Sequence, residues 1–124
     1  MGQSFRDVPA WQHAMQLVNT VYAFTRSFPA EEQNGLTSQV RRTAVSVPSN
    51  IAAGQALPQK EFLHCLSTAR GSLAELQTQA LIAVDLGFVA AGAAAALIEE
   101  TNRVDQMVEA LYSTVDVGWN RSSL

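Results

Sequence analysis

Cysteine, aromatic residues and charged residues are all scarce in this chain. Cys65 is its only cysteine, so an intrachain disulfide is impossible and a reducing cytoplasm is the expected compartment. Aromatic residues occupy 7% of the 124 positions, so the core must be built from Leu, Val, Ile and Ala. Only 15% of the residues are charged, which predicts that other subunits cover part of the surface.

Targeting signals and strong net charge are also missing. No apolar run approaches the roughly 20 residues that a membrane span requires, and the chain does not open on a secretory signal. The net charge is −3 and the pI is near 5.2, which gives no general attraction to nucleic acid or to an anionic membrane. We therefore expect a cytoplasmic protein with no membrane partner.

Catalytic and cofactor-binding motifs are absent as well. The sequence contains no nucleophile elbow, zinc-ligand spacing or catalytic dyad, and the glycines of segment 87–92 mark a link between helices. We therefore expect no catalytic residue, no cofactor and no metal, and we do not expect an enzyme.

Helical periodicity, in contrast, runs through most of the sequence. Apolar residues recur at spacings of three and four, most regularly from Phe62 to Val84, and no strand-like alternation is present. The pattern predicts an all-α fold, an antiparallel up-down-up-down four-helix bundle that forms a single domain over 1–124. Its helices are expected near 8–27, 36–54, 58–86 and 91–116, with a loose lead-in over 1–7 and a tail over 118–124 in which Trp119 alone is expected to be pinned.

Glycine and proline mark special positions in these helices. Gly54 and Gly87 are expected to end the second and third helices, and Asp7 to cap the first. Gly71 lies inside the third helix, where glycine costs ~1 kcal/mol against alanine, which predicts a close approach by a neighbour. Pro48 lies inside the second helix, and because the apolar spacing keeps its phase on both sides, one kinked helix is favoured.

The first helix has a wider apolar face than one neighbouring helix needs. Its apolar positions form two adjoining stripes, Trp11-Met15-Val18-Tyr22 and Leu17-Val21-Phe24-Phe28. One stripe is expected to face the inside of the monomer and the other to lie against another copy. The width of this face, together with the sparse charge, predicts a homo-oligomer.

A polar cluster on the second and third helices is the best candidate for an interaction site. Its members are Arg41, Arg42, Ser46, Asn50 and Glu75. Arg42 lies nearer the apolar stripe and is expected to reach Glu75 or Gln79, whereas Arg41 is expected to face outward. Structural ion pairing and ligand binding both stay open for the arginines, and helix packing or a polar pocket for the rest. On the fourth helix, four carboxylates are expected on a solvated face or on a docking surface for a basic partner: Glu99, Glu100, Asp105 and Glu109.

The same central segment resembles a family of small bacterial four-helix-bundle proteins named for reading frames in intervening sequences of 23S rRNA genes. The similarity extends from Trp11 into the fourth helix and is specific as an ensemble, not in any single piece. The matching pieces include Gly35-Leu36, Arg42-Thr43-Ala44, Ser46-Val47-Pro48-Ser49-Asn50-Ile51-Ala52, Lys60-Glu61-Phe62, Ala69-Arg70-Gly71-Ser72 and Glu75-Leu76. The resemblance implies a bundle that assembles as a ring, often a pentamer. Some relatives resemble accessory proteins of diversity-generating retroelements, which bind nucleic acid.

The sequence departs from the family pattern at Ala53, where a glutamate is usual, and it is less basic than the nucleic-acid-binding relatives. The expected function is therefore a non-enzymatic, homo-oligomeric scaffold or interaction protein. The alternative is a nucleic-acid-binding accessory protein that uses a basic collar of Arg41 and Arg42. Because no aromatic platform is expected beside these arginines, binding at physiological salt is predicted to be weak or absent.

Overall fold

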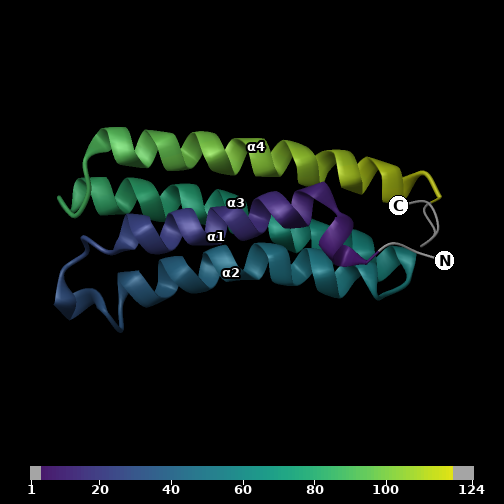
Figure 1. Ribbon diagram of the computed structural model, residues 1–124, viewed down its shortest axis with the longest axis horizontal. Helices are drawn as coiled ribbons and strands as arrows, with labels where there is room; N and C mark the ends of the chain where they lie inside the picture. Colours follow the sequence, from purple (N-terminus) through teal and green to yellow (C-terminus); the bar gives the residue numbers. More distant parts are fainter. Residues whose placement is uncertain (1–3, 119–124) are drawn as a thin grey trace.

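The computed structural model describes residues 4–118 and contains four long antiparallel helices packed as a bundle (Figure 1). The helices are α1 (Pro9–Thr25), α2 (Leu36–Gln55), α3 (Gln59–Asp85) and α4 (Ala91–Asp116). The predicted fold class is therefore confirmed, and every helix boundary lies within two residues of its predicted position. Of the expected tail only Gly118 is described, and Trp119 lies outside the described residues.

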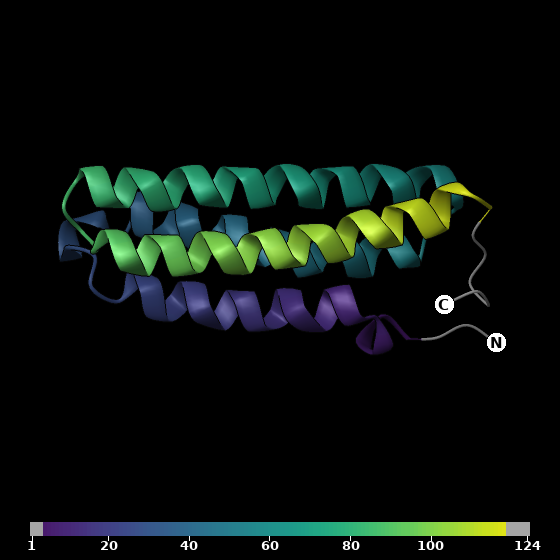
Figure 2. The same ribbon diagram turned by 90° about the horizontal axis from the view of Figure 1, so that it is seen from above.

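Each helix packs against the next along the chain, and α4 closes the bundle by packing against α1. Figure 2 shows the bundle from above, with α3 and α4 side by side along their whole length. The interior is built mainly from aliphatic side chains, together with the rings of Phe28 and Phe62. Its largest fully buried members are Phe62, Leu17, Ile51, Leu66, Leu73, Leu76 and Leu97. Such a core agrees with the small share of aromatic residues in the sequence.

The segment before α1 is more ordered than a loose lead-in. Residues Phe5–Asp7 form a short 3-10 helix, and the Phe5 ring meets the edge of Trp11 at a centroid distance of 5.2 Å. The prediction that Asp7 caps α1 is therefore wrong. Val8 occupies the N-cap position without a side-chain hydrogen bond, and Pro9 supplies the first helical residue.

Helix α2 continues through Pro48, which confirms the prediction of one helix. The neighbouring polar side chains donate hydrogen bonds to carbonyl oxygens of the same turn, from Ser46 Oγ to Thr43 O at 2.6 Å and from Asn50 Nδ2 to Ser46 O at 2.8 Å. These bonds add donors to carbonyl oxygens on either side of Ala44 O, which is the carbonyl that the missing N–H of Pro48 would have reached.

Gly54 does not end α2, because the helix runs on to Gln55. The glycine lies instead at the close crossing of α2 and α3. A Cβ at this position would lie 2.7 Å from Cδ1 of Phe62 and 2.9 Å from Cβ of Cys65. Gly54 therefore serves close packing of the helices, whereas Gly87, with a φ of +77°, does end α3 as predicted.

We expect Gly54→Ala to lower the free energy of unfolding by about 1–3 kcal/mol, because the added methyl group overpacks the crossing. The neighbouring exposed Ala53→Gly measures what a glycine costs in the same helix without a clash, about 1 kcal/mol. Urea denaturation of both variants checks the prediction. If Gly54→Ala instead raised the free energy of unfolding by the amount that Ala53→Gly lowers it, the crossing would not need a glycine.

Candidate interaction site on α1, α2 and α3

The structure divides the predicted polar cluster between two sides of α2. Arg41 extends toward α1, whereas Ser46 bonds to Ser72 of α3, and Asn50 bonds back to Ser46 O within α2. Arg42 and Glu75 are exposed, and both arginines line an open cleft between α1 and α2. The cluster is therefore spread over a basic cleft and a polar seam, and Ser46 belongs to both, because it lines the cleft and bonds to Ser72 of α3.

Arg41, and not Arg42, is the arginine that contacts a neighbouring helix, so the predicted orientations are wrong. Its Nε donates a hydrogen bond to Thr25 Oγ1 at 2.8 Å, and its Cζ lies 4.4 Å from the centroid of the Tyr22 ring. A stacking interaction of this kind fixes the planar guanidinium over the aromatic face. An aromatic residue therefore does lie beside the arginines, contrary to expectation, although Arg41 occupies one face of it.

The arginines share no ion pair with a carboxylate among the described residues, where every ion pair found involves Arg70 or Arg103. Arg41 is half-buried and held in place by Thr25 and Tyr22. The terminal nitrogens of a guanidinium remain able to donate after its Nε has bonded. The cleft thus presents an oriented cation whose charge is not neutralised within the described part of the chain.

The seam between α2 and α3 consists of hydroxyl and amide groups. Ser46 Oγ and Ser72 Oγ share a hydrogen bond of 2.7 Å, and Gln79 Nε2 donates to Thr43 Oγ1 at 3.0 Å. Thr43, not Arg42, is the residue that reaches Glu75, over a weak contact of 3.5 Å. The Gln79 side-chain oxygen is buried and has no hydrogen-bond partner among the described residues. These contacts hold two helices together, which supports the helix-packing interpretation of Ser46.

Thr43→Val is expected to cost about 1–3 kcal/mol of stability, because it leaves the buried Gln79 amide without its acceptor. Gln79→Met is expected to change the free energy of unfolding by less than about 1.5 kcal/mol, because it removes both polar groups of that side chain at similar volume. Thermal and urea unfolding of the two variants test the difference. Equal losses in both variants would contradict this account of the seam.

An apolar face covers the outer side of α1 and α2, next to the basic cleft. Its residues line one groove and include Trp11, Met15, Val18, Val45, Pro48 and Ala52. Met15 is 43% exposed and Val45 41%, and Tyr22 at the edge of the cleft is 41% exposed. The first predicted stripe of α1 is thus the one left at the surface, while Leu17 and Val21 of the second stripe are fully buried. We call these six groove residues the apolar face.

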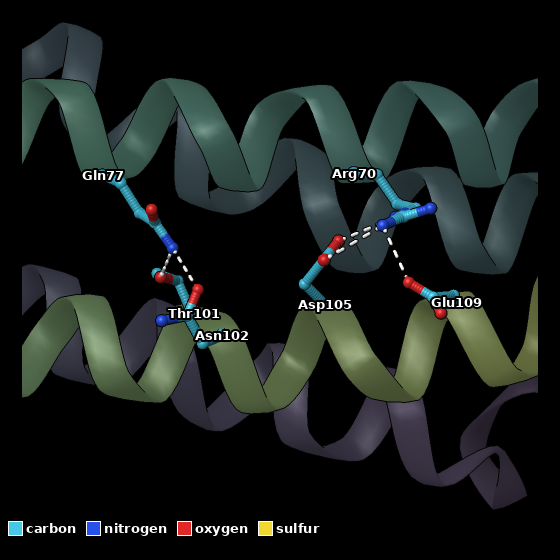
Figure 3. Close-up of polar contacts among 6 residues, drawn as sticks. All are labelled: Arg70, Gln77, Thr101, Asn102, Asp105 and Glu109. Carbon is cyan, nitrogen blue, oxygen red and sulfur yellow. Dashed lines mark hydrogen bonds and ion pairs between the residues drawn. The ribbon is translucent and has the colours of Figure 1, made fainter.

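The opposite pair of helices carries a polar network that the sequence had not revealed (Figure 3). Arg70 binds Asp105 through two hydrogen bonds, of 2.9 and 3.2 Å, and Glu109 through one of 3.0 Å. Gln77 donates to Thr101 Oγ1 and Asn102 Oδ1, each at 2.7 Å (Figure 3). Asp105 is therefore paired and half-buried, not part of a solvated face.

These contacts also act on the protonation of Arg70. The hydrogen bond to Asp105, reinforced by the charges of Asp105 and Glu109, raises the pKa of Arg70 above its ordinary value, against an opposing effect of burial. A raised pKa means that the charged form stabilises the fold at any pH below the ordinary value and loses this effect only at strongly alkaline pH. Because the side chains are partly exposed, the ion pairs are worth at most about 1 kcal/mol each.

Ala53, the position at which the family usually has glutamate, lies on the exposed surface of α2. A carboxylate at this position would therefore lie at the surface of the described chain. Gly71 is exposed too, and no atom would lie within 4 Å of a Cβ added to it. The close neighbour predicted for Gly71 does not come from the described residues of this chain.

Within residues 4–118 no group of His, Cys, Asp and Glu could hold a metal ion, and no helix is long and apolar enough to cross a membrane. The fold and this site define a small four-helix-bundle protein with an exposed apolar face beside a basic cleft.

The sequence model of one protein family matches residues 6–110, which span nearly the whole bundle. The chain belongs to that family, the 23S rRNA-intervening sequence proteins, as its central motif had indicated. A comparison with curated proteins found no match.

Proposed function

We propose that the protein is a non-enzymatic scaffold or interaction protein that acts as a homo-oligomer in the cytoplasm. The observation that carries this proposal is the apolar face on α1 and α2, where Met15 and Val45 are each more than 40% exposed. Large apolar side chains gathered in one groove favour burial against a partner. A second copy that covers the wide apolar stripe of α1 would remove these side chains from water.

The charge of α1 supports the same proposal. Not one of its 17 residues, from Pro9 to Thr25, is Asp, Glu, Lys or Arg. A helix at the surface of a monomer normally has a charged outer side, whereas a helix that is covered on two sides needs none. Self-association gives α1 its second covered side.

A ring of five copies is the proposed assembly, which follows the family resemblance and requires a contact between two different faces of each subunit. Light scattering at micromolar concentration tests it. The expected mass is about five times the 13.4 kDa of one chain. A mass near 13.4 kDa would reject the oligomer, and another multiple would reject only the subunit number.

Nucleic-acid binding is the second candidate function, favoured by the unneutralised Arg41 and the exposed Arg42 in one cleft. In a ring these residues would recur in every copy and could form a basic collar. Arg41 already covers one face of Tyr22, so base stacking on that ring would have to use the other face. Affinity would depend on phosphate contacts and would fall steeply with salt.

We expect weak or absent binding of DNA and RNA at ~150 mM salt, and binding at ~50 mM salt that Arg41→Ala/Arg42→Ala removes. Fluorescence anisotropy with labelled single- and double-stranded oligonucleotides measures both variants at both salt concentrations. Sub-micromolar affinity at ~150 mM salt that depends on the two arginines would place the nucleic-acid function first.

A further inference from the structure

Charge is divided unequally between the two halves of the bundle. Helices α1 and α2 contain no carboxylate, and Arg41 and Arg42 give them a net charge of +2. Helices α3 and α4 contain eight carboxylates against Lys60, Arg70 and Arg103, a net charge of −5. Because each pair of helices forms one side of the bundle, the molecule has a basic, apolar side and an acidic side.

The acidic side is also hollowed. A groove runs between α3 and α4, lined among others by Ser67, Gly71, Ala74, Gln77, Asn102 and Asp105. Little side-chain volume lines the α3 side of the groove, because Gly71 has no side chain and Ala74 has a small one. Both residues are exposed. A glycine inside a helix costs ~1 kcal/mol against alanine, and nothing within the described chain approaches Gly71 to use the space. Arg70 and Leu73 also line this groove, and Arg70 pairs with Asp105, so the charges of the lining itself balance. We call these residues the acidic groove after the net charge of α3 and α4.

From these observations we propose that the apolar face of one copy packs into the acidic groove of the next copy. This inference rests on the proposed homo-oligomer and adds which two surfaces meet. Met15 and Val45 protrude on one side, and Gly71 and Ala74 leave room on the other. The opposite net charges of the two sides favour this orientation and disfavour contact between two identical sides.

The protruding residues and the groove lie at the same level along the bundle. The Ser46–Ser72 hydrogen bond sets residue 46 of α2 level with residue 72 of α3. Pro48, two residues further along α2, is therefore about level with Arg70 and Gly71 on antiparallel α3. Met15 lines the same groove as Pro48, so it also lies near this level. Two copies placed side by side with parallel axes thus bring Met15 to Gly71.

The charged groups match in the same register. The Ser46–Ser72 and Thr43–Gln79 hydrogen bonds place Arg41 between the levels of Gln77 and Leu81 on antiparallel α3, and Gln77 binds Asn102 on α4. Glu99 and Asp105 each lie three residues from Asn102, which is within one helical turn. Arg41 of one copy therefore meets the groove near Glu99 and Asp105, where it would add a third cation to the existing Arg103–Glu99 and Arg70–Asp105 ion pairs.

The experiment uses one variant for each surface of the full chain. Val45→Glu/Ser49→Glu places two carboxylates on the apolar face, and Gly71→Arg/Ala74→Arg fills the acidic groove with two cations. All four positions are exposed, so both variants should keep the helical circular dichroism spectrum of the wild type. Gln16→Glu/Ala110→Arg, on exposed positions of α1 and α4 away from both surfaces, is the matched control.

Sedimentation velocity at one protein concentration gives the result. Each variant alone is expected to be monomeric, while an equimolar mixture forms dimers, because each variant keeps the one surface that its partner has lost. The control should assemble as the wild type does. A wild-type monomer would reject the proposed oligomer itself.

If the wild type assembles but the Gly71→Arg/Ala74→Arg variant does so too, the acidic groove is not the partner surface and the inference is wrong. A mixture that stays monomeric while each variant is folded would overturn it equally, because two different surfaces in one contact must complement each other.

Discussion

Replacing Phe62 with alanine is expected to lower the free energy of unfolding by about 3–5 kcal/mol. The ring is the largest fully buried side chain of the core and packs at the crossing of α2 and α3, against Gly54. A decrease of this size is a large fraction of the free energy of unfolding of a typical domain, about 5–15 kcal/mol. Urea denaturation with matched protein concentrations measures the loss.

The partly buried Phe24 supplies the control, because Phe24→Ala removes the same atoms from a less enclosed position. Its cost should be clearly smaller. A second comparison tests the crossing directly, since the loss caused by Gly54→Ala should shrink when Phe62 is already alanine. Equal costs for Phe24→Ala and Phe62→Ala, or additive effects at Gly54 and Phe62, would contradict the packing described here.

The substitution Met15→Glu is expected to raise the dissociation constant of the assembly by about a hundredfold or more. Burying a carboxylate without a partner costs several kcal/mol, and each 1.4 kcal/mol corresponds to a factor of ten. The monomer should be unaffected, because Met15 is 43% exposed before assembly. Light scattering over a dilution series measures the change.

Gln16→Glu is the matched control for Met15→Glu, because it adds the same charge one residue along on the side of α1 that faces α4. Its assembly should remain close to that of the wild type. Should both substitutions weaken assembly alike, or neither do so, the apolar face would not be the surface that a second copy covers.

Sequence alone predicted the elements of the fold closely. Apolar spacing, Pro9 at the start of α1 and Gly87 after α3 are local features, and each helix boundary depends on residues within one or two turns of it. The passage of α2 through Pro48 was predicted for the same reason, since the phase of the apolar residues can be read on both sides of the proline.

The candidate site was predicted less well. Residues that share the central motif do not share one site, because successive helix positions point about 100° apart. Arg41 turned out to stack on Tyr22, 19 residues earlier, and Arg70 to bind Asp105, 35 residues later. A single sequence carries no spacing rule for such pairs between helices, so neither partner could be named in advance.

Sequence by itself determined that this chain forms four helices with a core of small aliphatic residues and an apolar surplus on α1, because helix formation and amphipathicity follow from the order of neighbouring residues. Only the tertiary structure decided what the special residues do. Gly54 became a packing contact and not a helix end, because Phe62 and Cys65 of another helix come to lie against it. Gly71 became an open surface position, because no helix of the described chain packs over that side of α3.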